Sequence, residues 1–600
     1  MLRILSTSSI AKNVISKKLF KSSKRSHVLV HRYKIMEKRN CQNCRKDFTI
    51  ESEDFNFYEK VKVPAPTWCP ECRMIRRCNS ANGWSLFYRN CDKCGKRTLS
   101  AYPPEQKITV YCQPCWWSDS WDGSEYAMDY DATRPFLAQL RELAEKTPYT
   151  ALETEYLTLK NCDYSNAIAN CKNCTLAIWA DYSENAYFSS FINGAKDTAD
   201  SLRIFSSELC YESIGQNKAY RVFYSQECDA CTDVWFSRNC YGCMNCVGCV
   251  NLRGASYRIF NVQYTKDEYS QKLKELKLDT RSGIEKIKNE IEVFWKKFPH
   301  RFYMGDTFNL NVTGEYVYGS RNSKDMYNCQ GAEGCRWCQF ITVRPAKDCM
   351  DYSGWGNGVE LIYESASIGN NASNVKFSAY CFPDVVNIEY CLWCIAPKNN
   401  FGCVNLKRKS YSILNKQYSK EEYEKLKAQI IEDMKKNPYI DEQGRAWPYG
   451  EFFGPCFDRY AYNNSNANKF FPKTREEALK EGYTWNDEEE KQADATMKGN
   501  ELPETIAEVS ESILKEIISC TTCERKYKIA SLEFDLLRKM GMPLPARCLK
   551  CREKARFDKL QKPHLYDREC MKCNKSIRTS YAPERPEIVY CEKCYQQEFI

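Results

Sequence analysis

Two runs of eight cysteines, one near each end of the chain, have identical spacing and constrain the fold more than any other feature. In each run, four C-x2-C pairs are separated by 24, 18 and 17 residues, so a constant offset of 479 maps one run onto the other. C-x2-C pairs at loop-length separation are how a chain surrounds a tetrahedral metal ion. Eight thiolates complete two sites, so the sequence predicts about four zinc ions. The predicted ligands are Cys41, Cys44, Cys69, Cys72, Cys91, Cys94, Cys112, Cys115, Cys520, Cys523, Cys548, Cys551, Cys570, Cys573, Cys591 and Cys594.

The duplication extends beyond the cysteines and defines one module used twice, at 37–119 and 519–600. Phe55, Arg73 and Arg77 recur as Phe534, Arg552 and Arg556 at the same offset. Two pairings of the C-x2-C units are open. Sequential pairing, which we favour, joins the first unit with the second and the third with the fourth. Interleaved pairing would give a cross-braced site.

Histidine is scarce, with only four residues in the chain. All-cysteine metal sites are therefore expected, and a Ser-His-Asp triad or an H-E-x-x-H helix is hard to build. There is no G-x-x-x-x-G-K-[ST] loop. We find no catalytic residue set and expect a protein that is not an enzyme. No apolar run approaches the roughly 20 residues of a membrane span, so no membrane partner is expected.

Residues 1–36 form a basic leader with nine Lys or Arg and no acidic residue. This composition is typical of a mitochondrial transit peptide. The alternative is that Met36 is the true start, which would make the protein cytoplasmic. Both readings place the cysteines in a reducing, intracellular compartment, where metal binding is favoured over disulfides. Without the leader, 88 − 9 = 79 basic residues face 78 acidic ones.

Charge distinguishes the two modules. The first counts 14 basic and 10 acidic residues, and the second counts 18 and 11. Two zinc–tetrathiolate sites would add about −4 to each, which leaves only the C-terminal module positive. We therefore expect any nucleic-acid contact there, although a solvated face or a carboxylate partner would explain the same residues. The candidate contacts are Arg552, Lys554, Arg556 and Arg568.

The middle of the chain contains two regions, 150–264 and 305–418, of short β-type runs separated by polar residues. Their spacing looks irregular, and the pattern favours an all-β coil or solenoid. The regions are themselves duplicated, because the segment 249–253 (CVNLR) recurs as 403–407 (CVNLK) at an offset of 154. The predicted fold class is thus mainly β with short helices, an internally duplicated cysteine-rich core lying between the two terminal modules.

Helical segments connect these parts. A connector at 120–149 contains a predicted helix at 135–146. Capping boxes begin a helix in 265–304, at Thr265 with Glu268, and another in 419–518, at Ser419 with Glu422. The second segment continues as a polar linker at 486–504 and an amphipathic helix at about 505–518.

Nineteen further cysteines lie between Cys162 and Cys456. The tightest group is Cys240, Cys243, Cys246 and Cys249, which is close to an iron–sulfur spacing but one residue short in its last gap. The three readings are an iron–sulfur site, another metal site, and small buried residues lining a tight β coil. The last is favoured, since cysteine packs as a small hydrophobe.

The first half of each module resembles a known small domain. The residues that carry the resemblance are Cys41, Cys44, Phe48, Phe55, Tyr58, Pro66, Cys69, Cys72 and Arg73, with their counterparts from Cys520 to Arg552. This pattern is similar to the "probable zinc-ribbon" domain of bacterial proteins, which implies sequential pairing and two double zinc-ribbon modules. From Met36 onward, about nine-tenths of the chain resembles uncharacterised large zinc-ribbon proteins of bacterial metagenomes. The resembling stretches are 116–119, 246–252, 449–453 and 581–591. The resemblance implies an architecture and brings no activity.

Two functions from different classes follow. The first is a zinc-binding, non-enzymatic scaffold or adaptor for a protein or for RNA or a ribonucleoprotein, with RNA or ribonucleoprotein favoured. The second is a redox or metal-handling protein that uses the central cysteines. The sequence does not specify an oligomeric state.

Overall fold

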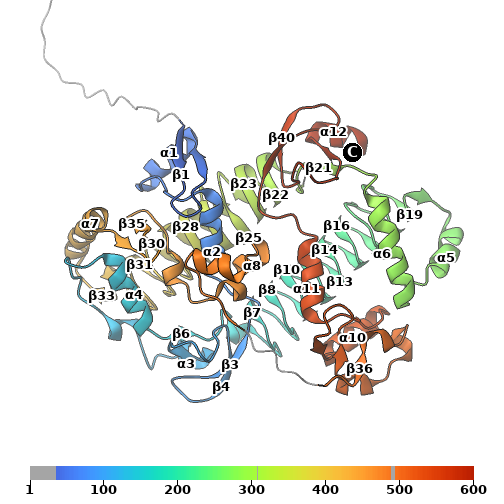
Figure 1. Cartoon of the computed structure of the whole chain (residues 1–600), viewed down its shortest axis with the longest axis horizontal. Helices are drawn as coiled ribbons and strands as arrows, with labels where there is room; N and C mark the ends of the chain where they lie inside the picture. The colour runs from blue at the N-terminus through green and yellow to red at the C-terminus, as the bar shows by residue number, and fades with distance from the viewer. Residues whose placement is uncertain (1–35, 307, 488–493, 600) are drawn as a thin grey trace, which may run out of the picture.

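Short strands dominate the computed structural model, which describes residues 36–306, 308–487 and 494–599 (Figure 1). The basic leader lies outside the described residues, apart from Met36. No helix in the described part of the chain is long and apolar enough to cross a membrane.

The first β region consists of two sheets whose strands alternate along the chain. Strands that are neighbours in a sheet are parallel and pair at an offset of 12 residues, as Ser190 does with Leu202. The six-stranded sheet contains β7 (Asn166–Ala169), β8 (Ile178–Asp181), β10 (Ser190–Asn193), β12 (Leu202–Phe205), β14 (Ile214–Asn217) and β16 (Gln226–Asp229). The eight-stranded sheet contains β9 (Glu184–Tyr187), β11 (Lys196–Ala199), β13 (Glu208–Tyr211), β15 (Tyr220–Phe223), β17 (Thr232–Trp235), β18 (Met244–Val247), β19 (Ser256–Ile259) and the antiparallel β20 (Val262–Gln263).

The expected irregular spacing is wrong for this region, because its backbone repeats in steps of three residues. Every third residue from Asn161 to Phe260 has positive φ, and the strands from β8 to β17 begin six residues apart. Taken every six residues, positions 165 to 255 hold only Ser, Ala or Cys. At several of these positions a serine hydroxyl accepts a hydrogen bond from the backbone N–H of the residue 12 positions further along the chain. Ser201 N–H, for example, donates to Ser189 Oγ at 3.1 Å.

The second β region repeats this plan less evenly in one sheet of twelve strands, with pairing offsets of 11 to 14 residues. Its strands are β22 (Leu310–Tyr318), β23 (Arg321–Gln330), β24 (Ala332–Glu333), β25 (Gln339–Val343), β26 (Ala346–Lys347), β27 (Met350–Gly356), β28 (Val359–Gly369), β29 (Ala372–Lys376), β30 (Val385–Glu389), β31 (Lys398–Phe401), β32 (Ser412–Ile413) and β33 (Lys416–Gln417). The interiors of both regions are packed with cysteine, alanine and aliphatic side chains.

The helices mostly follow the sequence signals. The connector helix is α4 (Phe136–Lys146), and both predicted capping boxes are present, at α5 (Lys266–Glu275) and α7 (Lys420–Lys436). The segment after α5 breaks and restarts as α6 (Arg281–Trp295). The amphipathic helix expected at 505–518 is wrong. That stretch contains two 3-10 turns, at Ile506–Glu508 and Glu511–Lys515, whose β-branched and serine residues disfavour a longer helix.

The terminal modules have the same elements at the same offset of 479. The first contains β1 (Glu37–Asn40), β2 (Asp47–Ile50), α1 (Ser52–Val61), α2 (Pro70–Asn79), β3 (Phe87–Asn90), β4 (Arg97–Ser100), β5 (Val110–Tyr111) and α3 (Gln113–Trp117). The second contains β37 (Ile518–Ser519), β38 (Lys526–Tyr527), α10 (Ser531–Met540), α11 (Leu549–Asp558), β39 (Tyr566–Glu569), β40 (Ser576–Thr579), β41 (Val589–Tyr590) and α12 (Glu592–Phe599).

Each module packs on the β region that is distant from it in sequence. The N-terminal module shares a hydrophobic core with the second region, where Phe57 and Tyr58 meet Tyr363. The C-terminal module shares one with the first region, where Phe534 joins Tyr187. Figure 1 shows α2 lying beside β28 and α11 beside β13 and β14. The chain ends therefore cross over and tie the two β regions together.

Candidate metal centres and the central cavity

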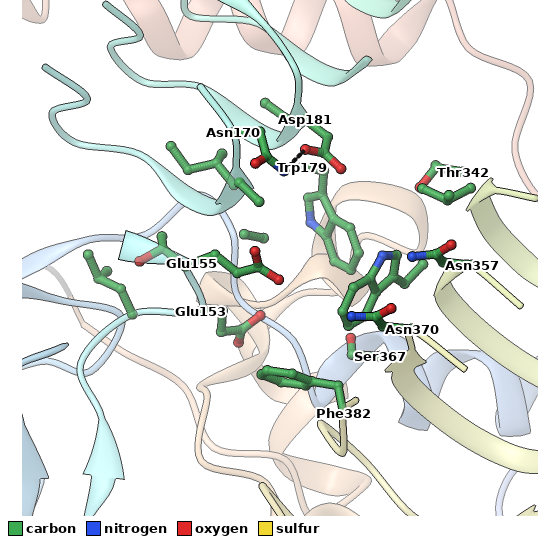
Figure 2. Close-up of a pocket in the computed structure, with 18 of the residues that line it drawn as sticks. Glu153, Glu155, Asn170, Trp179, Asp181, Thr342, Asn357, Ser367, Asn370 and Phe382 are labelled. Carbon is green, nitrogen blue, oxygen red and sulfur yellow. Dashed lines mark hydrogen bonds between the residues drawn. The ribbon is translucent and has the colours of Figure 1, made fainter. Parts of the chain in front are cut away.

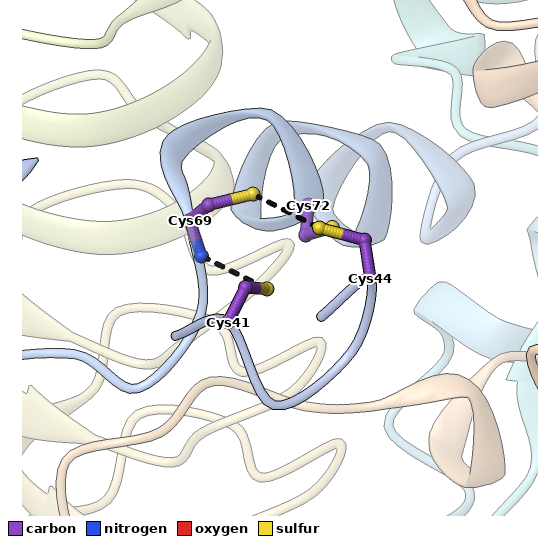
Figure 3. Close-up of side chains that lie close together, drawn as sticks. All are labelled: Cys41, Cys44, Cys69 and Cys72. Carbon is purple, nitrogen blue, oxygen red and sulfur yellow. Dashed lines mark hydrogen bonds between the residues drawn. The ribbon is translucent and has the colours of Figure 1, made fainter. Parts of the chain in front are cut away.

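The sixteen predicted ligands come together as four groups of four, each with all its sulfur atoms within 4.8 Å of one another. The groups combine the C-x2-C units sequentially. In each group one unit lies in the turn of a short hairpin, and the other lies at the start of a helix. In the first group these are the turn between β1 and β2 and the N-terminus of α2, where Cys69 is the N-cap (Figure 3).

The sulfur separations match a single tetrahedral ion. Cys44 and Cys69 lie 3.8 Å apart, and the equivalent pairs of the other three groups are separated by 3.8, 3.6 and 3.7 Å. A tetrahedron with zinc–sulfur bonds of about 2.3 Å has edges of about 3.8 Å. Each group can therefore hold one metal ion at its centre.

The local backbone favours thiolates. In all four groups the first cysteine accepts an N–H bond at 3.2 Å from the N-cap cysteine of the helix, as Cys41 Sγ does from Cys69. Burial raises the pKa of Cys520, but backbone N–H donors led by Cys548 outweigh it and lower that pKa to about 6. The same balance lowers the pKa of Cys91 to about 7. Thiolates are the form that binds metal, so these donors favour that form at the first cysteine of both groups, whereas burial raises the pKa of the partner cysteines Cys548 and Cys112.

The central cysteines are arranged differently. Cys240, Cys243, Cys246 and Cys249 are at most 1% exposed and lie three residues apart, in step with the three-residue repeat of the backbone. Each thiol donates to the carbonyl two residues before it, as Cys249 does to Val247 at 3.5 Å. They do not appear among the described groups whose sulfurs converge within 4.8 Å. The spacing that resembles an iron–sulfur motif coincides with the three-residue repeat of the backbone.

The predicted nucleic-acid contacts are divided between the interior and the surface. Arg552 and Arg556 on α11 are 2% and 5% exposed, and both pair with the fully buried carboxylate of Asp200. Arg552 also pairs with Glu533 at 2.8 Å. A phosphate cannot reach these two guanidinium groups, so their assignment as surface contacts is corrected: the carboxylate partner is the reason for their presence. Lys554 is exposed, and Arg568 is half-buried against the carbonyl of Ala582.

The N-terminal module repeats this contact on the other β region. Arg73 on α2 pairs with Asp351 at 2.9 Å, and Arg77 pairs with the same carboxylate at 3.2 Å. Arg76 adds a contact that the C-terminal module lacks, because Ala555 stands at its counterpart position. Arg76 forms ion pairs with Glu364 and with Glu451, the second at 2.9 Å. Its guanidinium group lies over the ring of Trp68. Buried ion pairs of this kind require good geometry, since each charge has lost its water.

A cavity of about 410 Å³ lies where the first module meets both β regions. The sequence reasoning missed it. Figure 2 shows Glu153 and Glu155 on one side, with Asn357 and Asn370 facing them from the second region. Aromatic side chains form much of its wall: Trp116, Trp117, Trp179, Trp355, Phe382 and Trp393. The one available signal was the set of tryptophans inside otherwise small-residue strands, but only the fold shows that they converge.

Three carboxyl groups face this cavity without a basic partner. None of the described residues that line it is Lys, Arg or His. Burial raises the pKa of Glu153 to about 8, although Tyr460 donates a hydrogen bond to it at 3.0 Å. Burial also raises the pKa values of Glu155 and Asp181, and Asp181 contributes to the shift at Glu155 through charge repulsion. The cavity is therefore lined by aromatic and polar side chains, and its three carboxyl groups make it anionic when they are ionised.

Comparisons with known proteins give little. No protein-family model matches the chain, and no curated protein matches it. One solved structure, described as a putative acetyltransferase from Desulfovibrio desulfuricans G20, aligns at 10% identity over 48% of this chain and 86% of its own, with a TM-score of 0.09. A similarity at that level carries no argument about fold or activity.

Proposed function

We propose that this protein is a zinc-dependent, non-enzymatic scaffold whose four zinc ions hold two modules that clamp an internally duplicated β core. The observation that carries the proposal is the convergence of sixteen cysteines into four groups at tetrahedral spacing. Zinc fits because the ligands are four thiolates per site. Its binding would supply roughly 10–16 kcal/mol per site toward folding of modules that have small cores of their own.

The way the modules dock supports the scaffold role. In each module, two cysteines of one four-cysteine group lie at the start of the helix that carries the buried arginines. These are Cys69 and Cys72 in α2, and Cys548 and Cys551 in α11. Fixing that helix N-terminus fixes the arginines, which in turn hold the distant β region. We also propose that each β region is a β-solenoid. The constant 12-residue pairing offset of the first region supports this.

Elemental analysis of protein purified without added metal tests the proposal. We expect about four zinc and no iron per chain. Removing the metal with a strong chelator should expose sites in α2 and α11 to limited proteolysis before the β regions are cut. A chain that carries less than one zinc, or whose modules resist proteolysis equally with and without metal, would contradict a structural role for zinc.

RNA or a ribonucleoprotein stays the predicted partner class, with a smaller candidate surface. Of the four residues named for it, Lys554 has a side chain that is 75% exposed, although it pairs with Asp558 at 2.6 Å. Charge reversal at Lys554 should weaken RNA binding and reduce its salt dependence by about one ion. Unchanged binding would exclude this surface. Reversal at Arg552 is unsuitable as a test, because it would break a buried ion pair.

A further inference from the structure

The cavity where the first module meets the two β regions is lined by aromatic and acidic side chains. Its walls combine aromatic faces from several elements: Trp179 of β8 stacks on Phe191 at a centroid distance of 6.0 Å, and Trp355 of β27 meets Phe382 at 5.6 Å. Its volume, about 410 Å³, is in the range of small-molecule sites. The contacts between the modules and the β regions do not require an open cavity at this place.

The acidic groups of the cavity differ from the fully buried carboxylates at the module contacts, because Glu155 is exposed and Asp181 is half-buried. Asp200 and Asp351 each face two arginines. Among the described residues, Asp181 accepts hydrogen bonds from Asn170, at 3.0 Å, and from the backbone N–H of Tyr182. Among the described residues, no cation contributes to the electrostatic environment of Glu155, whose neighbour is the like-charged Asp181. These two carboxylates are therefore only partly desolvated, and no basic side chain among the described residues lines the cavity beside them.

We propose that the cavity binds an organic ammonium ion, whose charge is met by Glu155 and Asp181 and whose alkyl groups pack on the indole rings of Trp179 and Trp355. Aromatic faces attract ammonium groups through their quadrupole, and carboxylates add a direct charge interaction. An anionic ligand such as a nucleotide or a phosphate is disfavoured, because no basic side chain lines the cavity in the described chain. The amide groups of Asn357 and Asn370, on the opposite wall, would orient a neutral remainder of the ligand.

The test compares probes of equal shape and different charge on the full-length, zinc-loaded protein. Choline and benzyltrimethylammonium are the cationic probes, 3,3-dimethyl-1-butanol is the neutral isostere of choline, and maltose represents a neutral saccharide. Binding is measured by saturation-transfer NMR and calorimetry. We expect both ammonium probes to bind, and the neutral isostere to bind roughly tenfold more weakly or not at all.

Two variants and one control locate the site. Glu155→Gln and Asp181→Asn keep side-chain shape and remove charge, and each should weaken choline binding roughly tenfold. Glu142→Gln removes a carboxylate from an exposed pair on α4 and should leave binding unchanged. Zinc content is measured on every variant. Absence of choline binding with zinc fully retained would count against this proposal alone, whereas a protein without zinc would count against the proposed scaffold. Equal binding of choline and its isostere, binding of maltose alone, or no binding of either ammonium probe overturns the proposal.

Discussion

Asp200 and Asp351 occupy equivalent places in the two β regions, and each accepts hydrogen bonds from two arginines of one module helix. Both are fully buried, and both have the positive φ that recurs every third residue. Because Arg552 and Arg556 correspond to Arg73 and Arg77, the same docking contact has been retained in both halves of a duplicated chain. The duplication therefore covers the modules, the β regions and the contact between them.

Replacing one of these aspartates should release one module. Asp200→Asn leaves two buried arginines without a full counter-charge and should destabilise the docked C-terminal module by about 3–5 kcal/mol. Asp351→Asn should do the same to the N-terminal module. Urea titration monitored by limited proteolysis of each module measures the effect. The control, Asp558→Asn, disrupts only the exposed pair with Lys554 and should cost under about 1 kcal/mol. Equal losses in Asp200→Asn and the control would contradict the docking role.

The zinc content should depend on the four-cysteine groups of the modules and not on the cysteines of the β regions. Cys548→Ser removes one ligand of a tetrad and should lower the zinc content from about four to about three ions per chain. Cys249→Ser is the matched control. Ser237 already occupies the same position one turn earlier and makes the same bond, its hydroxyl donating to Trp235 O at 2.9 Å. The control should keep all its zinc and lose roughly 1 kcal/mol of stability. A loss of zinc in Cys249→Ser would contradict this division.

Sequence reasoning recovered what depends on local spacing. Residues close in the chain determine three predicted features, and the structure contains all three. They are the sixteen clustered cysteines, the capping boxes at Thr265 and Ser419, and the helix at 136–146. The three-residue period was missed because no single residue type marks it. Its inward positions hold Ser, Ala, Cys and Ile alike, since what they share is burial.

The errors come from contacts over long sequence separations. Arg552 reads as a surface cation, because nothing near it in the chain shows that Asp200, 352 residues away, will bury it. The cavity is also non-local: Glu155, Trp179 and Trp355 converge only once both β regions are stacked and joined. The expected helix at 505–518 failed for a local reason as well, since its β-branched and serine residues disfavour a long helix. Its apolar residues, including Ile506 and Ile513, pack on the module core as short turns.

Gly354 should be required for the wall of the cavity. It has a φ of +93°, and a Cβ there would lie 3.2 Å from Cη2 of Trp179. Gly354→Ala should therefore cost about 1–3 kcal/mol and displace the indole ring, because strain and crowding act together. Thermal unfolding and near-ultraviolet circular dichroism measure the two effects. Gly444→Ala has a similar φ of +74° with open space around it, so it controls for backbone strain alone. An equal effect in both variants would show that Trp179 is not held against Gly354.

The pKa of Glu153 predicts a pH dependence that one substitution should remove. Burial raises this pKa from the ordinary glutamate value of 4.5 to about 8 in the folded protein. The folded state then binds the proton more tightly than the unfolded state, so Glu153 favours folding at low pH. That contribution is lost as the pH rises from the unfolded pKa through the folded pKa. Between pH 6 and 8.5, where zinc stays bound, the wild-type protein should lose on the order of 2 kcal/mol relative to Glu153→Gln. The variant keeps an oxygen that can accept the hydrogen bond from Tyr460. Thermal unfolding of both proteins across this range measures the difference, and parallel pH profiles would mean that Glu153 is ionised in the folded protein at neutral pH.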